Sequence, residues 1–128
     1  MQDTASDDLM LLADAARLVR RTDLGRSVLS ALREKFSGTA DAAEAAFRLG
    51  RLEFDAQRYP EAGRWFDAYA REAPEGPFAA EALGRRLDAW RRVGDARAFD
   101  AATQYLDKYP KGSYAPLARE VLGGATHP

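Results

Sequence analysis

The fold is decided by one stretch of the chain, residues 42–74, which reads AAEAAFRLGRLEFDAQRYPEAGRWFDAYAREAP. Apolar side chains recur there every three or four residues, which is the spacing of one face of an α-helix. Arg58 and Tyr59 interrupt the pattern, and Pro60 follows, where the first turn of a helix tolerates proline. The stretch therefore predicts two helices, about residues 40–56 and 60–73, joined by a short turn.

The first of these two helices is apolar on two sides. One side carries alanines and leucines, among them Ala45 and Leu49, while Phe47 and Phe54 occupy the other. A helix that is apolar on opposite faces is buried between two neighbours rather than covering one core. We therefore expect further helices on both sides of residues 42–74.

The flanking sequence predicts such helices. Turn signals recur at near-constant spacing, at Gly38, Gly76 and Gly112. Helical periodicity begins at Asp7, with Ser6 or Asp7 as a candidate N-cap. A later predicted helix, about residues 96–109, has Phe99 on its inner face. The predicted buried face of the first helix consists of Leu9, Leu12, Ala16 and Val19.

Periods of this size indicate a helical solenoid, because no single helix pair can bury its own apolar face. No stretch alternates polar and apolar residues as a strand would. We expect an all-α protein that forms a single domain over residues 1–128. Its helix pairs cover about 7–38, 40–75 and 77–111, and a short capping helix covers about 113–122.

The central pair resembles the tetratricopeptide repeat (TPR), whose pattern is W-x2-L-G-x2-Y, then A-x3-F, then P. The matching residues are Leu49, Gly50, Ala62, Phe66 and Pro74. The chain departs from the pattern where Ala46 replaces the Trp and where Glu53 and Phe54 stand at the Tyr position. The resemblance implies a right-handed superhelix in which the first helix of each pair lines a concave groove.

The amino-acid sequence of several segments, such as WFDAYAREAPEGP and YLDKYPKGSYAPLARE, is also similar to TPR modules of bacterial cell-envelope proteins. Those proteins include FecR-like and anti-sigma-factor-associated chains and outer-membrane assembly lipoproteins. This resemblance implies a periplasmic or envelope setting, although residue types alone leave the compartment unknown.

The groove positions that the TPR resemblance implies give a set of candidate partner-binding residues. They are Met10, Asp14, Arg17, Glu44, Phe47, Arg51, Phe54, Asp55, Arg85 and Arg92. Two alternatives stay open from the sequence. Phe47 and Phe54 could pack between repeats instead of facing a ligand. The arginines near residue 85 could belong to a salt-bridge ladder formed by Glu81, Arg85, Asp88 and Arg92.

Composition argues against several classes of function. The net charge of −1 offers no basic face to a nucleic acid, and no apolar run reaches the length of a membrane-spanning helix. The 128-residue chain has no cysteine, and its one histidine, His127, is next to last. The common nucleophiles and general bases are therefore scarce, and no metal or phosphate-loop motif is present. We expect no catalysis, no cofactor and no metal site.

These observations predict a non-catalytic scaffold that binds a peptide or protein segment on its concave face. The alternative is a structural module that self-associates, as a homo-oligomer, or that spaces domains in a larger envelope or anti-sigma-factor-type protein.

Overall fold

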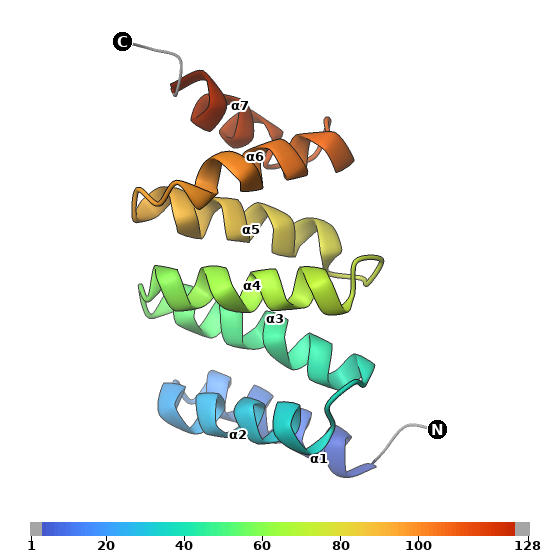
Figure 1. The fold of residues 1–128 in the computed structure, drawn as a ribbon. Coiled ribbons are helices and arrows are strands. Elements are labelled where there is room, and N and C mark those ends of the chain that lie inside the picture. Colours follow the sequence, from blue (N-terminus) through green and yellow to red (C-terminus); the bar gives the residue numbers. More distant parts are fainter. Residues whose placement is uncertain (1–3, 125–128) are drawn as a thin grey trace.

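The computed structural model describes residues 4–124, which form seven helices and no strand. The helices are α1 (Thr4–Leu18), α2 (Thr22–Lys35), α3 (Ala40–Asp55), α4 (Tyr59–Glu72), α5 (Ala79–Arg92), α6 (Arg97–Lys108) and α7 (Ala115–Gly124). Each helix packs against the next one along the chain, and α5 also contacts α7. Figure 1 shows the resulting stack, with α1 and α7 at opposite ends. The all-α prediction is confirmed, and the arrangement is consistent with a helical solenoid.

Helix α3 is buried on two sides, as its sequence predicts. Ala45 and Ala46 are both fully buried, and Phe47 is 4% exposed. Ala45 belongs to a core cluster shared with α1 and α2, whereas Ala46 and Phe47 belong to a second cluster shared with α4 and α5. The central helix therefore joins two hydrophobic cores, which explains why it carries apolar residues on two faces.

Glycine sets how closely neighbouring helices approach. A Cβ atom on Gly50 would lie 2.7 Å from Cε1 of Phe66, and one on Gly63 would lie 2.6 Å from Cε2 of Trp90. Both distances are shorter than carbon atoms tolerate, so each aromatic ring lies directly against a helix backbone. The Leu49-Gly50 part of the TPR-like pattern thus has a packing reason: it makes room for Phe66.

A buried tyrosine holds the turn after α4, and another holds the turn after α6. The backbone N–H of Phe78 donates to the hydroxyl of Tyr69 at 2.9 Å, and the N–H of Tyr114 donates to the hydroxyl of Tyr105 at 3.1 Å. Tyr69 and Tyr105 are each 1% exposed. The same contact therefore recurs at the same relative position, 36 residues apart in the sequence.

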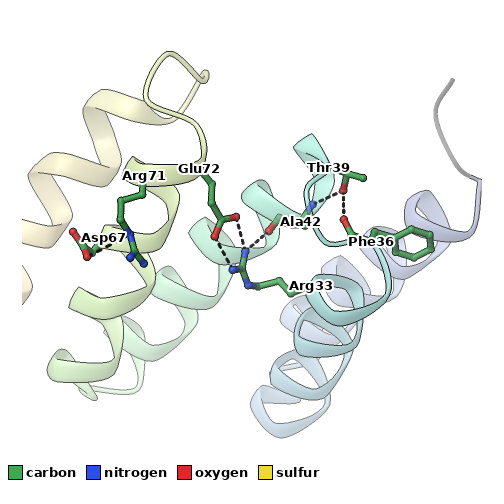
Figure 2. Close-up of polar contacts among 7 residues, drawn as sticks. All are labelled: Arg33, Phe36, Thr39, Ala42, Asp67, Arg71 and Glu72. Atoms are coloured by element: carbon green, nitrogen blue, oxygen red, sulfur yellow. Dashed lines mark hydrogen bonds and ion pairs between the residues drawn. The ribbon is translucent and has the colours of Figure 1, made fainter.

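The turn between α2 and α3 is held differently, by polar contacts (Figure 2). The Thr39 side chain accepts a hydrogen bond from the Ala42 amide at 3.1 Å, which caps α3, and donates to the Phe36 carbonyl at 2.6 Å. Arg33 donates to the Ala42 carbonyl at 2.7 Å and to both carboxylate oxygens of Glu72. Arg33 thereby ties α2 to the start of α3 and to the end of α4.

The prediction for α1 is wrong in its start and in part of its buried face. The helix begins at Thr4, so neither Ser6 nor Asp7 is its N-cap. Ala16 is buried as predicted, and Leu9 is partly buried against the same core. The other buried apolar residues of α1 are Met10 and Ala13, whereas Leu12 is 45% and Val19 is 67% exposed. Leucines and alanines occur on several sides of α1, and the small Ala13 and Ala16 permit closer packing against α2 than the leucines would.

Two details at the other end of the chain also differ from the sequence prediction. Phe99, expected on the inner face of α6, is 44% exposed, because Ala98, Ala101, Ala102 and Tyr105 fill that interface. Helix α7 continues through Gly123 and Gly124 instead of ending before them.

Candidate functional site

Side chains from α1, α3 and α5 meet on one side of the stack. Arg48 of α3 is ion-paired with Asp14 of α1. The guanidinium groups of Arg85 and Arg92, both on α5, lie 5.8 and 5.0 Å from the ring centroid of Phe54 on α3. We call this side the odd-helix face; it carries Asp14, Arg17, Glu44, Arg48, Arg51, Phe54, Arg85 and Arg92.

The structure places two of the candidate residues in the core. Met10 is 9% exposed and packs with α2, and Phe47 is 4% exposed. The Phe47 ring stacks on Phe78 with centroids 4.6 Å apart and meets Phe66 and Tyr69 edge-on at 5.7 and 5.6 Å. Of the two roles considered for Phe47, the structure therefore gives it the packing role between helices.

Phe54 is half-buried, and its surroundings are cationic. Its ring meets Tyr59 edge-on at 5.1 Å, and Arg85 and Arg92 lie over it. The hydroxyl of Tyr59 accepts a hydrogen bond from Arg92 at 3.1 Å. The part of the face expected to be aromatic is thus covered by two arginines.

The salt-bridge ladder on α5 is confirmed. Arg85 is paired with Glu81 at 2.9 Å and Arg92 with Asp88 at 3.2 Å. Hydrogen bonds to Asp88 and to Tyr59 raise the pKa of the Arg92 guanidinium. The charges of both arginines are therefore largely satisfied within the chain.

A cavity of about 560 Å³ opens between α1, α2 and α3. Its lining includes Asp14 and Arg17 of α1 and Arg48, Arg51 and Asp55 of α3, so it gathers four of the residues implied by the resemblance together with Arg48. Helix α2 supplies Thr22, Gly25 and Leu29, and these positions did not figure in the sequence analysis. Glu44 lies beside the cavity through its ion pair with Arg48 at 2.7 Å.

Two arginines of α3 have opposite electrostatic environments. Burial alone would lower the pKa of Arg48, but its hydrogen bonds to Glu44 and Asp14 raise it overall. Burial also lowers the pKa of Arg51, and the neighbouring cations Arg17 and Arg48 lower it further. Within residues 4–124, Arg51 forms no ion pair; its one recorded ring contact is to Phe47, at 6.0 Å. Both arginines have an acidic residue four positions away, Glu44 for Arg48 and Asp55 for Arg51, but only the first pair forms an ion pair within residues 4–124, so the sequence carries no signal for this difference.

Among residues 4–124, no cluster of three or more His, Cys, Asp or Glu side chains could hold a metal ion. His127 lies outside that range. No described helix is both long and apolar enough to cross a membrane.

Comparison with known proteins leaves the chain without an assigned family. Neither a scan against models of protein families nor a search of curated proteins gives a match.

Proposed function

We propose that the chain is a non-catalytic protein-interaction module. In this proposal its helices form a right-handed solenoid of three TPR-like pairs followed by a terminal helix, and the odd-helix face binds a peptide or protein segment. The observation that carries the proposal is the cavity of about 560 Å³ between α1, α2 and α3.

The composition of the cavity supports this function. Its floor is partly apolar, with Ala13, Leu29 and Leu52, and its rim carries the charged groups of α1 and α3. Sites that bind other molecules commonly combine an apolar surface with a few placed polar groups. Because three successive helices frame the cavity, a segment lying in it contacts two neighbouring helix pairs, as segments bound on the concave surfaces of repeat proteins do.

Two synthetic libraries of random peptides, one with amidated and one with free C-termini, test this proposal. Thr22 is exposed at the start of α2 and lines the cavity, so Thr22→Trp should fill it without disturbing the core. Ser30 is also exposed on α2 but does not line the cavity, which makes Ser30→Trp the matched control. We expect the wild-type chain to enrich peptides that Ser30→Trp still binds and Thr22→Trp does not. Enrichment of no peptide, or equal binding by both variants, would contradict the proposal.

A second candidate function, self-association, is favoured by the outer side of α1. Four large apolar side chains of α1 and the residue directly after it are exposed, although most such groups elsewhere are covered: Leu11 at 66%, Leu12 at 45%, Leu18 at 84% and Val19 at 67%. We call these four residues the α1 stripe. In the described chain α1 packs mainly against α2, so this side has no neighbour.

Charge distribution suggests a second copy of this chain as the occupant of the α1 stripe. The exposed Asp8 lies near the beginning of α1, and Arg20 and Arg21 lie shortly beyond its end. Antiparallel pairing of two α1 helices would place acidic and basic ends opposite one another while covering the stripe. The patch is small, so we expect a weak, concentration-dependent dimer rather than a permanent one.

Sedimentation equilibrium over a wide concentration range tests the dimer. Leu18→Asp should shift the equilibrium to monomer, because it places a carboxylate among the apolar side chains of the α1 stripe. Phe99→Asp changes an equally apolar exposed residue on α6 and should leave the dimer intact. A chain that stays monomeric at every concentration would exclude this second function while leaving the odd-helix face untouched.

A further inference from the structure

The cavity between α1, α2 and α3 has more positive than negative groups. Five arginines line it, Arg17, Arg20, Arg21, Arg48 and Arg51, with only two aspartates, Asp14 and Asp55. One of these two carboxylates is already used, because Asp14 is ion-paired with Arg48. The excess of cations is local, since the whole chain has a net charge of −1.

Arg17, Arg20 and Arg51 are the lining arginines that form no ion pair, and Arg17 is the one of the other two whose charge acts on Arg51. None of the three forms an ion pair or a hydrogen bond through its guanidinium group within residues 4–124, whereas Arg48 is bound by both Asp14 and Glu44. Arg51 is half-buried, and the charges nearest to it include the cations Arg17, Arg48 and Arg85. Asp55, the nearby acid, is exposed to solvent.

Such an arrangement is unfavourable for the folded chain alone. A half-buried guanidinium stays protonated in proteins and loses hydration on burial, and like charges nearby add repulsion. An arginine fork can bind both oxygens of a carboxylate at once, and such charge-assisted pairs are among the stronger hydrogen bonds. An added carboxylate would therefore relieve both the lost hydration and the repulsion.

We propose that Arg51 and Arg17 bind a carboxylate of an acidic peptide segment that lies in the cavity between α1, α2 and α3. This inference rests on the proposed function and names the chemistry of its ligand. The apolar residues Leu29 and Leu52 of the same cavity contact the side chains that flank the acidic residue. That apolar contact is why the occupant is a segment of a protein rather than a free small anion.

Two random-peptide libraries, one with amidated and one with free C-termini, test the inference. Together they distinguish a side-chain carboxylate from the carboxylate at the end of the peptide. Enrichment of Asp and Glu in the amidated library indicates side-chain recognition. Enrichment in the free-acid library alone, with the acid at the last residue, indicates a C-terminal carboxylate. Both results support the proposal. Enriched peptides without any preference for an acid would overturn it, although the interaction function would stand, whereas a failure to enrich peptides would defeat both.

Binding affinities then assign the carboxylate to Arg51. For an enriched peptide, replacing the acidic residue by its amide should weaken binding by about 10- to 100-fold, the range expected for a hydrogen bond between charged groups. Arg51→Gln should weaken the acidic peptide to the same extent and leave the amide peptide unchanged, so the two losses should not add. Arg64 is exposed on α4 and does not line this cavity, so Arg64→Gln is the matched control.

The thermal stability of Arg51→Gln distinguishes a ligand-binding role of Arg51 from a structural one. Because Arg51 is surrounded by cations and has no carboxylate partner, Arg51→Gln should melt at the same temperature as the wild-type chain or higher. Additive losses in the binding cycle, or a clear fall in melting temperature for Arg51→Gln, would overturn the assignment of the carboxylate to Arg51.

Discussion

Replacing Tyr69 with phenylalanine removes one oxygen atom and keeps the ring that fills the core. That oxygen accepts the hydrogen bond from the Phe78 amide at 2.9 Å, and Tyr69 is 1% exposed. In the Tyr69→Phe variant the N–H of Phe78 loses its partner at the entry to α5. The variant therefore measures what the hydroxyl contributes to the turn after α4.

The structure sets the size of the expected effect. Leaving a buried donor unpaired costs about 1–3 kcal/mol. Phe78 is only half-buried, so water can partly replace the lost acceptor, and we expect the lower part of that range, about 1–2 kcal/mol. For a domain of this size the melting temperature should fall by roughly 3–10 °C.

Thermal and urea denaturation followed by circular dichroism measure this loss. Tyr105→Phe should lose a similar amount of stability, because the Tyr105 hydroxyl accepts the corresponding hydrogen bond from the Tyr114 amide at 3.1 Å. Tyr109→Phe is the control, since the Tyr109 hydroxyl makes no hydrogen bond within residues 4–124 and its loss should change stability little. If Tyr69→Phe were as stable as Tyr109→Phe, the hydroxyl would not hold the turn and the reasoning would fail.

Three further predictions concern single positions, each read out by thermal denaturation. Gly84→Ala should destabilise the chain, because its Cβ would lie 2.1 Å from Cδ2 of Tyr114, whereas Gly123→Ala meets no atom within 4 Å and should gain up to about 1 kcal/mol of helix propensity. The pKa of Glu72 is lowered from its ordinary value of 4.5, chiefly by its hydrogen bonds with Arg33. The ionised Glu72 therefore stabilises the folded chain fully above pH 4.5, and this contribution to the free energy of unfolding is lost as the pH falls through the lowered pKa. Arg33→Met should flatten that acid part of the stability profile, and an unchanged profile would contradict the assignment. Arg86→Met should change stability by less than about 1 kcal/mol, because the Arg86 Nε is buried without a partner and its carboxylate partner remains hydrated, whereas Arg86→Ala should cost more through lost packing.

Sequence periodicity predicted the central helices well because their burial is nearly complete. In α3 both faces are covered, so every apolar position is informative, and Pro60 marks the start of α4 within one residue. In α1 the same reasoning failed. Leucines and alanines compete for the interface with α2, and the alanines occupy it because they permit closer packing, which only tertiary structure reveals.

The candidate site could be predicted only in part, for a similar reason. The TPR resemblance led to Arg17, Arg51 and Asp55, which do line the cavity. It gave no means to see that Phe47 turns into the core, since an aromatic residue at that spacing suits either role. The contribution of α2 was also missed, because a cavity framed by three helices depends on how far apart they stand and not on the pattern of any one of them.

The two joints next to the central helices are held by different forces, with a consequence for behaviour in salt. Ion pairs cross the first joint: Arg26 with Glu53 and Arg33 with Glu72, both at 2.8 Å, and Arg48 with Asp14. The second joint is crossed by the ion pair of Arg86 with Asp67 at 2.9 Å, and it also contains the buried tyrosine hydroxyl and the aromatic rings around it. Dissolved ions weaken ion pairs according to their exposure and scarcely affect buried neutral contacts. We therefore expect rising ionic strength to weaken the first joint more than the second, and only modestly, because the Glu53 carboxylate is buried.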